Sequence, residues 1–122
     1  MLNTGVDLIE IHRIEQAVEK QGARFLERIY TSKELALCGA NMPSLAGRFA
    51  AKEAVAKALC TGIGDVEWTD IEVLRGPNKE PILHLHGKAK KIAQQKKLKD
   101  WSISISHTHE HAIAMVVVLA QK

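Results

Sequence analysis

The chain has 122 residues, 46% of them hydrophobic and 25% charged, and its 17 Lys and Arg against 14 Asp and Glu give a formal net charge of +3. This length and composition exclude a fibrous or disordered chain and predict a single domain over residues 1–122. The small positive charge favours an anionic partner, such as phosphate, an acidic protein or RNA, without requiring nucleic acid.

Three features of the sequence indicate where in the cell the protein is expected: its N-terminal segment, its apolar runs and its cysteines. Carboxylates interrupt the first apolar residues, so no signal peptide is predicted. The longest apolar run, residues 112–120, is far shorter than the ~20 residues that a membrane-spanning helix needs. Cys38 and Cys60 form no CxxC motif and are predicted to be free, buried thiols. We therefore expect a cytoplasmic protein that has no contact with a membrane.

The first third of the chain predicts one strand and several short helical segments. Residues 2–11 alternate loosely between apolar and polar side chains, which is typical of a strand, and they lead into a helix over 11–20. A second helical segment covers 25–29. Thr31 or Ser32 then supplies the kind of side chain that caps the N-terminus of a further helical turn.

The rest of the chain predicts two helices and four strands. Residues 43–60 form the longest predicted helix, because they are rich in Ala, Leu, Lys and Glu and begin with Pro43. Residues 87–99 predict a second, lysine-rich helix. The predicted strands cover 69–74, 81–85, 101–106 and 112–120. The order β-α-α-β-β-α-β-β predicts an α+β fold with a mostly antiparallel sheet, on which the long Ala-rich helix packs.

Asp7 is unusual for its position, because it lies among apolar side chains such as Val6 and Leu8. An ionised carboxylate in such surroundings must find a cation or hydrogen-bond donors. Asp7 either caps a nearby helix or pairs with Arg13, or it binds a metal ion. The residues around it leave these interpretations open.

Glu53 lies in the long predicted helix one turn before Lys57, so the two side chains share a helix face. Taken alone, such a pair is most often a solvent-exposed ion pair. If Asp7 and Glu53 converge, however, their carboxylates form a pair of hard oxygen ligands that suits Mg²⁺. Lys57 and Arg48 would then face the oxygen atoms of a phosphate group.

Two basic or glycine-rich segments admit competing interpretations. The loop 61–64, which contains Gly62 and Gly64, is compatible with a phosphate-binding turn and equally with an ordinary helix C-cap. The lysines of 88–99 indicate either a solvated helix face or an anion-binding surface. A small basic nucleic-acid-binding module is therefore one alternative, although no aromatic side chain is interleaved with these lysines.

Three histidines near the C-terminus suggest a second alternative. His107, His109 and His111 alternate in a way that could place them on one strand face as metal ligands. No complete zinc-ligand set accompanies them. A His-liganded metal-binding protein is the alternative, and a turn is the simpler interpretation of His109 and His111.

Three motifs occur in a fixed order along the chain: GVDL at 5–8 with Ile11 and Arg13 behind it, GRFAAKEA at 47–54 with Lys57 behind it, and SISHT at 104–108. In order, in spacing and in chain length they resemble the short bacterial holo-acyl-carrier-protein synthases of the 4′-phosphopantetheinyl transferase superfamily. The loop 61–64 and residues 70–72 continue the match, so the resemblance covers nearly the whole chain.

The resemblance implies an enzyme of fatty acid biosynthesis that transfers the 4′-phosphopantetheine arm of coenzyme A to a serine of apo acyl carrier protein. The other product is adenosine 3′,5′-bisphosphate. Asp7 and Glu53 are implied to hold the Mg²⁺ cofactor, and Lys57 and His107 to lie near the phosphate groups as further catalytic residues. Either a carboxylate or a water on the metal would take the serine proton.

Further residues acquire roles through the same resemblance. Those that would contact coenzyme A, besides Lys57 and His107, are Arg48, Gly62, Gly64, Asn78, Pro81 and Thr108. Those that would meet the acidic carrier protein are Arg13, Arg24 and Arg28. Short members of the family are homotrimers with active sites between subunits, so Asn78 and Pro81 would come from the adjacent chain.

Overall fold

Two antiparallel sheets and a set of helices make up residues 1–121, the part of the chain that the computed structural model describes. In chain order the elements are β1 (Leu2–Glu10), α1 (Ile11–Gln21), α2 (Ala23–Ile29), α3 (Ser32–Cys38), α4 (Met42–Ala58), the 3-10 helix η1 (Trp68–Asp70), β2 (Ile71–Arg75), β3 (Pro81–Leu85), α5 (Gly87–Gln95), β4 (Leu98–His107) and β5 (His111–Ala120). The predicted α+β class, with antiparallel strands and a long helix, is confirmed.

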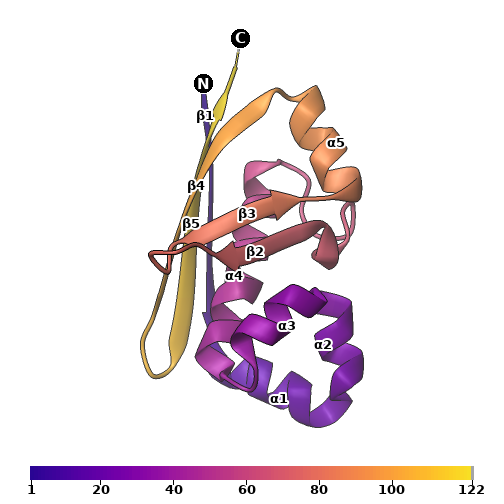
Figure 1. Ribbon diagram of the computed structural model, residues 1–122, viewed down its shortest axis with the longest axis vertical. Coiled ribbons are helices and arrows are strands. Elements are labelled where there is room, and N and C mark those ends of the chain that lie inside the picture. Colours follow the sequence, from indigo (N-terminus) through magenta and orange to yellow (C-terminus); the bar gives the residue numbers. More distant parts are fainter. Residues whose placement is uncertain (122) are drawn as a thin grey trace.

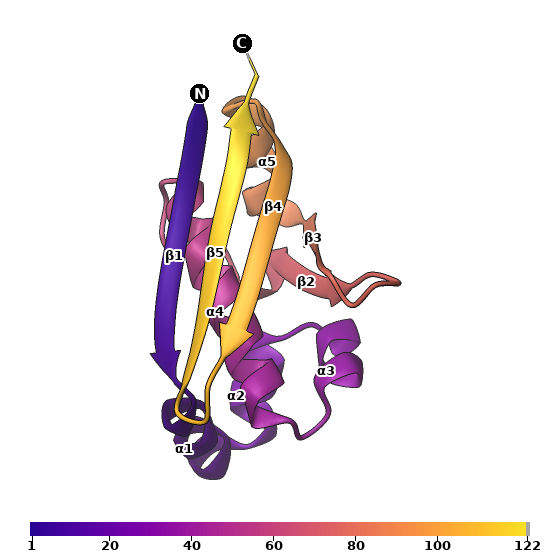
Figure 2. The same ribbon diagram turned by 90° about the vertical axis from the view of Figure 1, so that its left-hand side faces the viewer.

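The three-stranded sheet turns one face to the helices and leaves the other face open. β5 lies in the middle and pairs with β1 on one side and with β4 on the other, whereas β2 and β3 form a separate hairpin. Figure 1 shows the sheet edge-on with the helices to one side, and Figure 2 looks onto its open face. The inward-facing side chains of β5 are buried because they pack on α4: Ala112, Ala114, Val116 and Val118.

Small residues bring α4 unusually close to the sheet. A Cβ atom at Gly5 of β1 would overlap the carbonyl oxygen of Ala54, so only glycine allows this approach. A Cβ atom at Gly47 of α4 would come within 2.8 Å of the Ile105 side chain on β4. The predicted Ala-rich helix therefore packs so closely on the sheet that its backbone contacts the backbone of β1.

A buried ion pair joins α3, α4 and β2. Lys52 and Glu34 are both fully buried, and Lys52 Nζ lies 2.8 Å from Glu34 Oε1. The same carboxylate accepts hydrogen bonds from the backbone N–H groups of Thr31 at 2.9 Å and Val73 at 2.8 Å. Thr31 also caps α3, as predicted, because its hydroxyl oxygen accepts from the Glu34 N–H. Desolvation lowers the pKa of Lys52, and the adjacent Glu34 carboxylate opposes that shift.

Several predicted details are wrong. The predicted order has two helices between the first two strands, where the structure has the four helices α1 to α4, and the strands form two sheets in place of one. The helix predicted over 87–99 ends at Gln95, since Lys97 adopts a left-handed conformation (φ 57°) and Leu98 begins β4. Cys38 is buried as predicted, but Cys60 is exposed because it lies in the loop that leaves α4. No helix within residues 1–121 is long and apolar enough to cross a membrane.

Candidate active site

Asp7 and Lys57 meet where β1 packs on α4. The inward alternation of β1 turns Asp7 toward the helix, opposite Ala114 of β5. Lys57 Nζ donates a 2.8 Å hydrogen bond to the Val6 carbonyl and lies 3.3 Å from Asp7 Oδ1. The Asp7 side chain is largely shielded while that of Lys57 stays half exposed, so the pair faces solvent at the edge of the sheet.

Glu53 completes this group from one turn earlier on α4. Partial burial raises the pKa of its carboxyl group, the negative charge of Asp7 raises it further, and Lys57 partly offsets both effects. Glu53 therefore lies close enough to Asp7 for their charges to interact. The structure therefore brings Asp7, Glu53 and Lys57 together, as the predicted metal site requires.

The chemistry of this group fits a hard divalent cation. Two adjacent carboxylates, one of them disfavoured in its ionised form by the other, gain stability when a cation lies between them. Within residues 1–121 no group of three or more His, Cys, Asp and Glu side chains could hold a metal ion, so a zinc-type site at the three histidines is not supported. Two protein carboxylates, with the other positions left to water and phosphate, are typical of Mg²⁺.

A second, basic hollow lies beside β4. Its volume is about 220 Å³, and its lining includes Arg48, Arg75, Lys79, Pro81 and His107 but no Asp or Glu. Arg48 is nearly buried and is fixed in place because its Nε donates to the carbonyl oxygen of Val73 at 3.0 Å. Such a lining suits an anion.

The sequence placed Arg48, Pro81 and His107 in the site but missed Arg75 and Lys79. These two residues flank the β2–β3 turn, and their approach to β4 depends on how the small hairpin packs on the rest of the molecule. Asn78 lies in the same turn but does not line the hollow; its N–H donates to the Glu80 side chain.

The carboxylate group and the basic hollow lie on different sides of α4. Glu53 follows Arg48 by five positions, which corresponds to about 140° around the helix axis. Across the sheet, Asp7 aligns through Ala114 with Ile105, two positions before His107. With strands about 4.8 Å apart and rising about 3.4 Å per residue, the Asp7 and His107 Cα atoms are separated by roughly 12 Å.

The remaining predicted coenzyme A contacts lie in turns. Gly62 and Gly64 both have positive φ, and their N–H groups donate to the carbonyls of Ala56 and Val66. The hydroxyl oxygen of Thr108 accepts from two backbone N–H groups in the β4–β5 turn, which orders the segment directly after His107. All three residues therefore also have a structural role, because each makes hydrogen bonds within its own turn.

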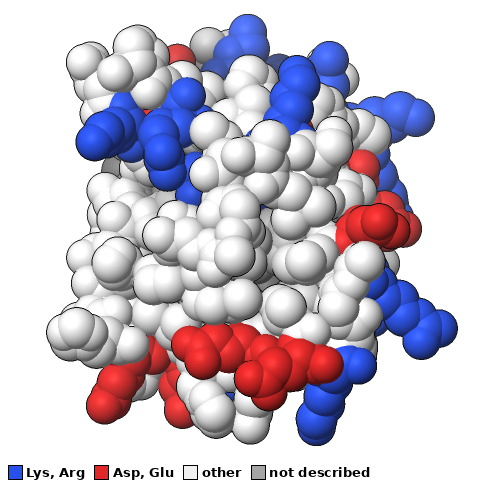
Figure 3. Space-filling model, turned by 60° about the horizontal axis from the view of Figure 1, so that its bottom comes forward, with Lys and Arg blue, Asp and Glu red and all other residues white. Residues whose placement is uncertain are grey.

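The predicted carrier-protein surface is mixed in charge. Arg24 and Arg28 of α2 line a shared hollow of about 290 Å³ with Gln21. Arg13 lies in a different hollow, where its Nε is 3.5 Å from Glu10 Oε1. Figure 3, which brings the lower end of the molecule forward, shows a band of acidic side chains along the lower part of this face, while basic side chains lie mainly at its upper left and right. The three arginines therefore do not form one uninterrupted basic surface.

Comparison with known families and sequences gives a consistent result. A family model described as the 4′-phosphopantetheinyl transferase superfamily matches residues 3–116. A holo-(acyl-carrier-protein) synthase of Herpetosiphon aurantiacus is 48% identical over 124 aligned residues, which cover 96% of this chain and 98% of the relative. A protein of the same name from Dehalococcoides mccartyi is 50% identical over 117 residues, with the same coverage.

Solved structures agree with this result. The Helicobacter pylori holo-(acyl-carrier-protein) synthase in complex with coenzyme A superposes with a TM-score of 0.87 at 38% identity, over 95% of this chain and 99% of that chain. The Bacillus anthracis synthase, solved with CoA (3′,5′-ADP), gives a TM-score of 0.79 at 38% identity, over 98% and 96% of the two chains. None of these relatives supports a nucleic-acid-binding module.

Proposed function

This chain belongs to the 4′-phosphopantetheinyl transferase superfamily, and we propose that it transfers the 4′-phosphopantetheine arm of coenzyme A to a serine of apo acyl carrier protein. The observation that carries the proposal is the convergence of Asp7, Glu53 and Lys57 where β1 meets α4. The names of the relatives, and the coenzyme A bound to the Helicobacter pylori protein, support the choice of substrates.

The reaction is a phosphoryl-type displacement. The serine oxygen forms a bond to the β-phosphorus of coenzyme A, the bond from that phosphorus to the bridging oxygen breaks, and adenosine 3′,5′-bisphosphate leaves with the electron pair. The serine proton passes to a base. The protein must neutralise the pyrophosphate charge and hold the two reacting atoms in line.

The side chains of the site divide this work. Asp7 and Glu53 would hold Mg²⁺, which when bound supplies positive charge to the phosphate oxygens. Lys57 adds a cation beside that position and also fixes the β1 backbone through Val6. His107 and Arg48 hold the nucleotide phosphate in the basic hollow, where no carboxylate opposes them. Fixed charges of this kind stabilise the transition state without reorganisation.

We further propose a homotrimer with active sites between subunits. The open face of the three-stranded sheet carries large exposed apolar side chains: Leu2, Val6, Leu8, Ile113, Met115 and Leu119. Such a contiguous apolar face favours burial against other copies. The carboxylate group lies at the free edge of β1 and the basic hollow at the free edge of β4, so neighbouring copies would join the two half-sites.

The remaining proposals concern partner and location. Arg24 and Arg28, which share a hollow, are the better placed of the predicted carrier-protein contacts, because Arg13 is already close to Glu10. An acidic carrier protein would be attracted by such guanidinium groups. The two free cysteines fit a cytoplasmic enzyme.

Intact-mass spectrometry of an apo acyl carrier protein tests the proposed function. The carrier protein is incubated with this protein, coenzyme A and Mg²⁺, and a parallel sample contains a chelator. We expect a mass gain of one phosphopantetheine arm that disappears with the chelator. A folded protein that binds coenzyme A but modifies no carrier protein would contradict the proposed acceptor, and absence of coenzyme A binding would contradict the whole assignment.

A further inference from the structure

A large cavity lies away from both half-sites. Its volume is about 800 Å³, within the range of about 300–1,000 Å³ that is usual for small-molecule sites. β3 and β4 approach each other near one end and diverge toward α5, which closes the wedge between them (Figure 1). The cavity occupies this wedge, on the opposite side of β4 from the open apolar face of the sheet.

The lining combines an apolar floor with a cationic rim. Leu85, Leu98 and Trp101 belong to the apolar part, and Lys90, Lys97 and Lys99 supply the positive charge. No Asp or Glu lines the cavity, and within residues 1–121 none of these lysines takes part in an ion pair. A ligand that fits both parts has an apolar body and a negatively charged end.

The backbone around this cavity departs from regular geometry in two places. Lys97 adopts φ 57° directly after the C-cap of α5, at a position where glycine is favoured. Its carbonyl accepts a 2.8 Å hydrogen bond from the N–H of Gln121, which holds this conformation. A left-handed lysine is less stable than a left-handed glycine at such a position.

The second departure is a bulge in β4. The register shifts between Lys99 and Trp101, and the extra residue, Asp100, has φ 60°. Leu98 and Trp101 are three positions apart, so a regular strand would turn them to opposite faces. With the bulge they pair with Ala120 and Val118, both on the inner face, and both line the cavity.

We propose that this cavity binds a single-chain amphiphilic anion, specifically a free long-chain carboxylate, with the chain on Leu85, Leu98 and Trp101 and the carboxylate at Lys90 and Lys97. The lining lysines would neutralise a carboxylate, and the apolar side chains between β3 and β4 would take an alkyl chain. The proposal does not depend on the proposed transferase function, because its test measures binding alone.

Calorimetric titration of the full chain with dodecanoate, below its micellar concentration, tests this site. We expect one binding site per chain. Acetate, which lacks the chain, and dodecyltrimethylammonium, which carries the opposite charge, should each bind at least about tenfold more weakly. In a Trp68→Phe background, Trp101 is the remaining tryptophan, and its fluorescence should change on dodecanoate binding.

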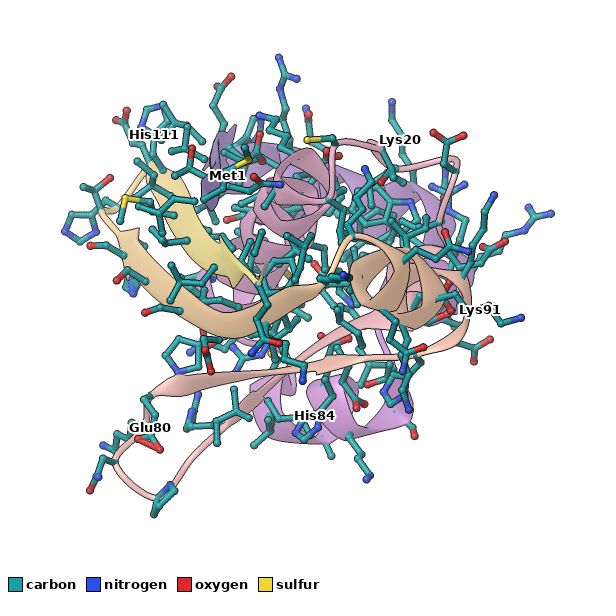
Figure 4. The ribbon with its side chains drawn as sticks, turned by 90° about the horizontal axis from the view of Figure 1, so that it is seen from above. Met1, Lys20, Glu80, His84, Lys91 and His111 are labelled. Atoms are coloured by element: carbon teal, nitrogen blue, oxygen red, sulfur yellow. The ribbon has the colours of Figure 1, made fainter. Side chains whose placement is uncertain are left out.

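Lys97→Gly is the most informative variant, because glycine suits φ 57° and the fold should be kept or stabilised. We expect its dodecanoate affinity to fall about fivefold while its thermal unfolding temperature stays level or rises. The matched control is Lys91→Ala, which removes the same charge from the outer side of α5. Figure 4, seen from the α5 end, shows Lys91 directed away from β4.

Three results would overturn the proposal. Equal binding of dodecyltrimethylammonium would show that the apolar surface alone is responsible. An equal loss of affinity in Lys91→Ala and Lys97→Gly would show a general charge effect. A loss in Arg75→Ala, which alters only the basic hollow at His107, would place the bound carboxylate there.

Discussion

Lys57 Nζ lies 3.3 Å from Asp7 Oδ1, and through the same ammonium group it also holds the backbone of the strand that carries Asp7. One cation therefore has two tasks at the proposed metal position. It offsets part of the repulsion between the two carboxylates, and it fixes the distance between β1 and α4. The outcome is a carboxylate pair whose geometry is set before any ligand binds, which is what electrostatic catalysis requires.

Glu53→Gln should abolish the transfer and stabilise the fold at neutral pH. The folded-state pKa of Glu53 is raised, so its ionisation costs stability above that pKa, and the cost disappears as the pH falls through the raised value toward the unfolded-state value. Denaturant unfolding should show the variant more stable than the wild type at pH 7 without added metal, and equal to it near pH 3. Near-normal transfer by the variant would refute the metal assignment.

Gly5→Ala should be strongly destabilising, by about 3 kcal/mol, because the new methyl group meets the backbone carbonyl of Ala54, which cannot move aside. Gly47→Ala provides the matched comparison: its methyl group meets the Cγ2 methyl of Ile105 at 2.8 Å, and a side-chain atom can shift more easily than a backbone carbonyl. Urea unfolding at pH 7 should rank Gly5→Ala clearly below Gly47→Ala. The reverse order would mean that the contact between β1 and α4 is no more rigid than the contact between β4 and α4.

Val6→Lys should break the proposed trimer. Val6 lies on the open face of the sheet and is half exposed in the single chain, so a lysine there is tolerated by the fold but places a charge in the proposed interface. Light scattering should report one chain in place of three, with transfer activity lost because each proposed site combines residues of two subunits. A variant that remains a trimer would exclude this face as the interface.

Arg75→Ala should raise the KM for coenzyme A about tenfold with a smaller effect on kcat. Arg75 lines the basic hollow but lies apart from the carboxylate pair, so it contributes to binding more than to the displacement itself. Steady-state kinetics with saturating carrier protein would measure both constants. A fall in kcat at constant KM would instead indicate that Arg75 acts on the transition state.

The sequence predicted the parts of the site that depend on local pattern. Glu53 and Lys57 share a helix face by spacing alone, and Asp7 was conspicuous as a charge among apolar residues. Arg75 could not be found in this way, because its position depends on how the β2–β3 hairpin packs beside β4. The sequence also predicts too long a helix α5. Glycine is the usual signal for a left-handed residue after a helix, and here a lysine, Lys97, occupies that position.

The buried pair of Lys52 and Glu34 also determines how the molecule can open. Lys52 donates to Glu34 and to the carbonyl oxygen of Trp68, while Glu34 receives the N–H groups of Thr31 and Val73. Detachment of α3 alone would leave the Lys52 ammonium group in the interior without Glu34, and detachment of β2 alone would leave the Glu34 carboxylate without the Val73 N–H. The buried pair therefore disfavours separate opening of either segment.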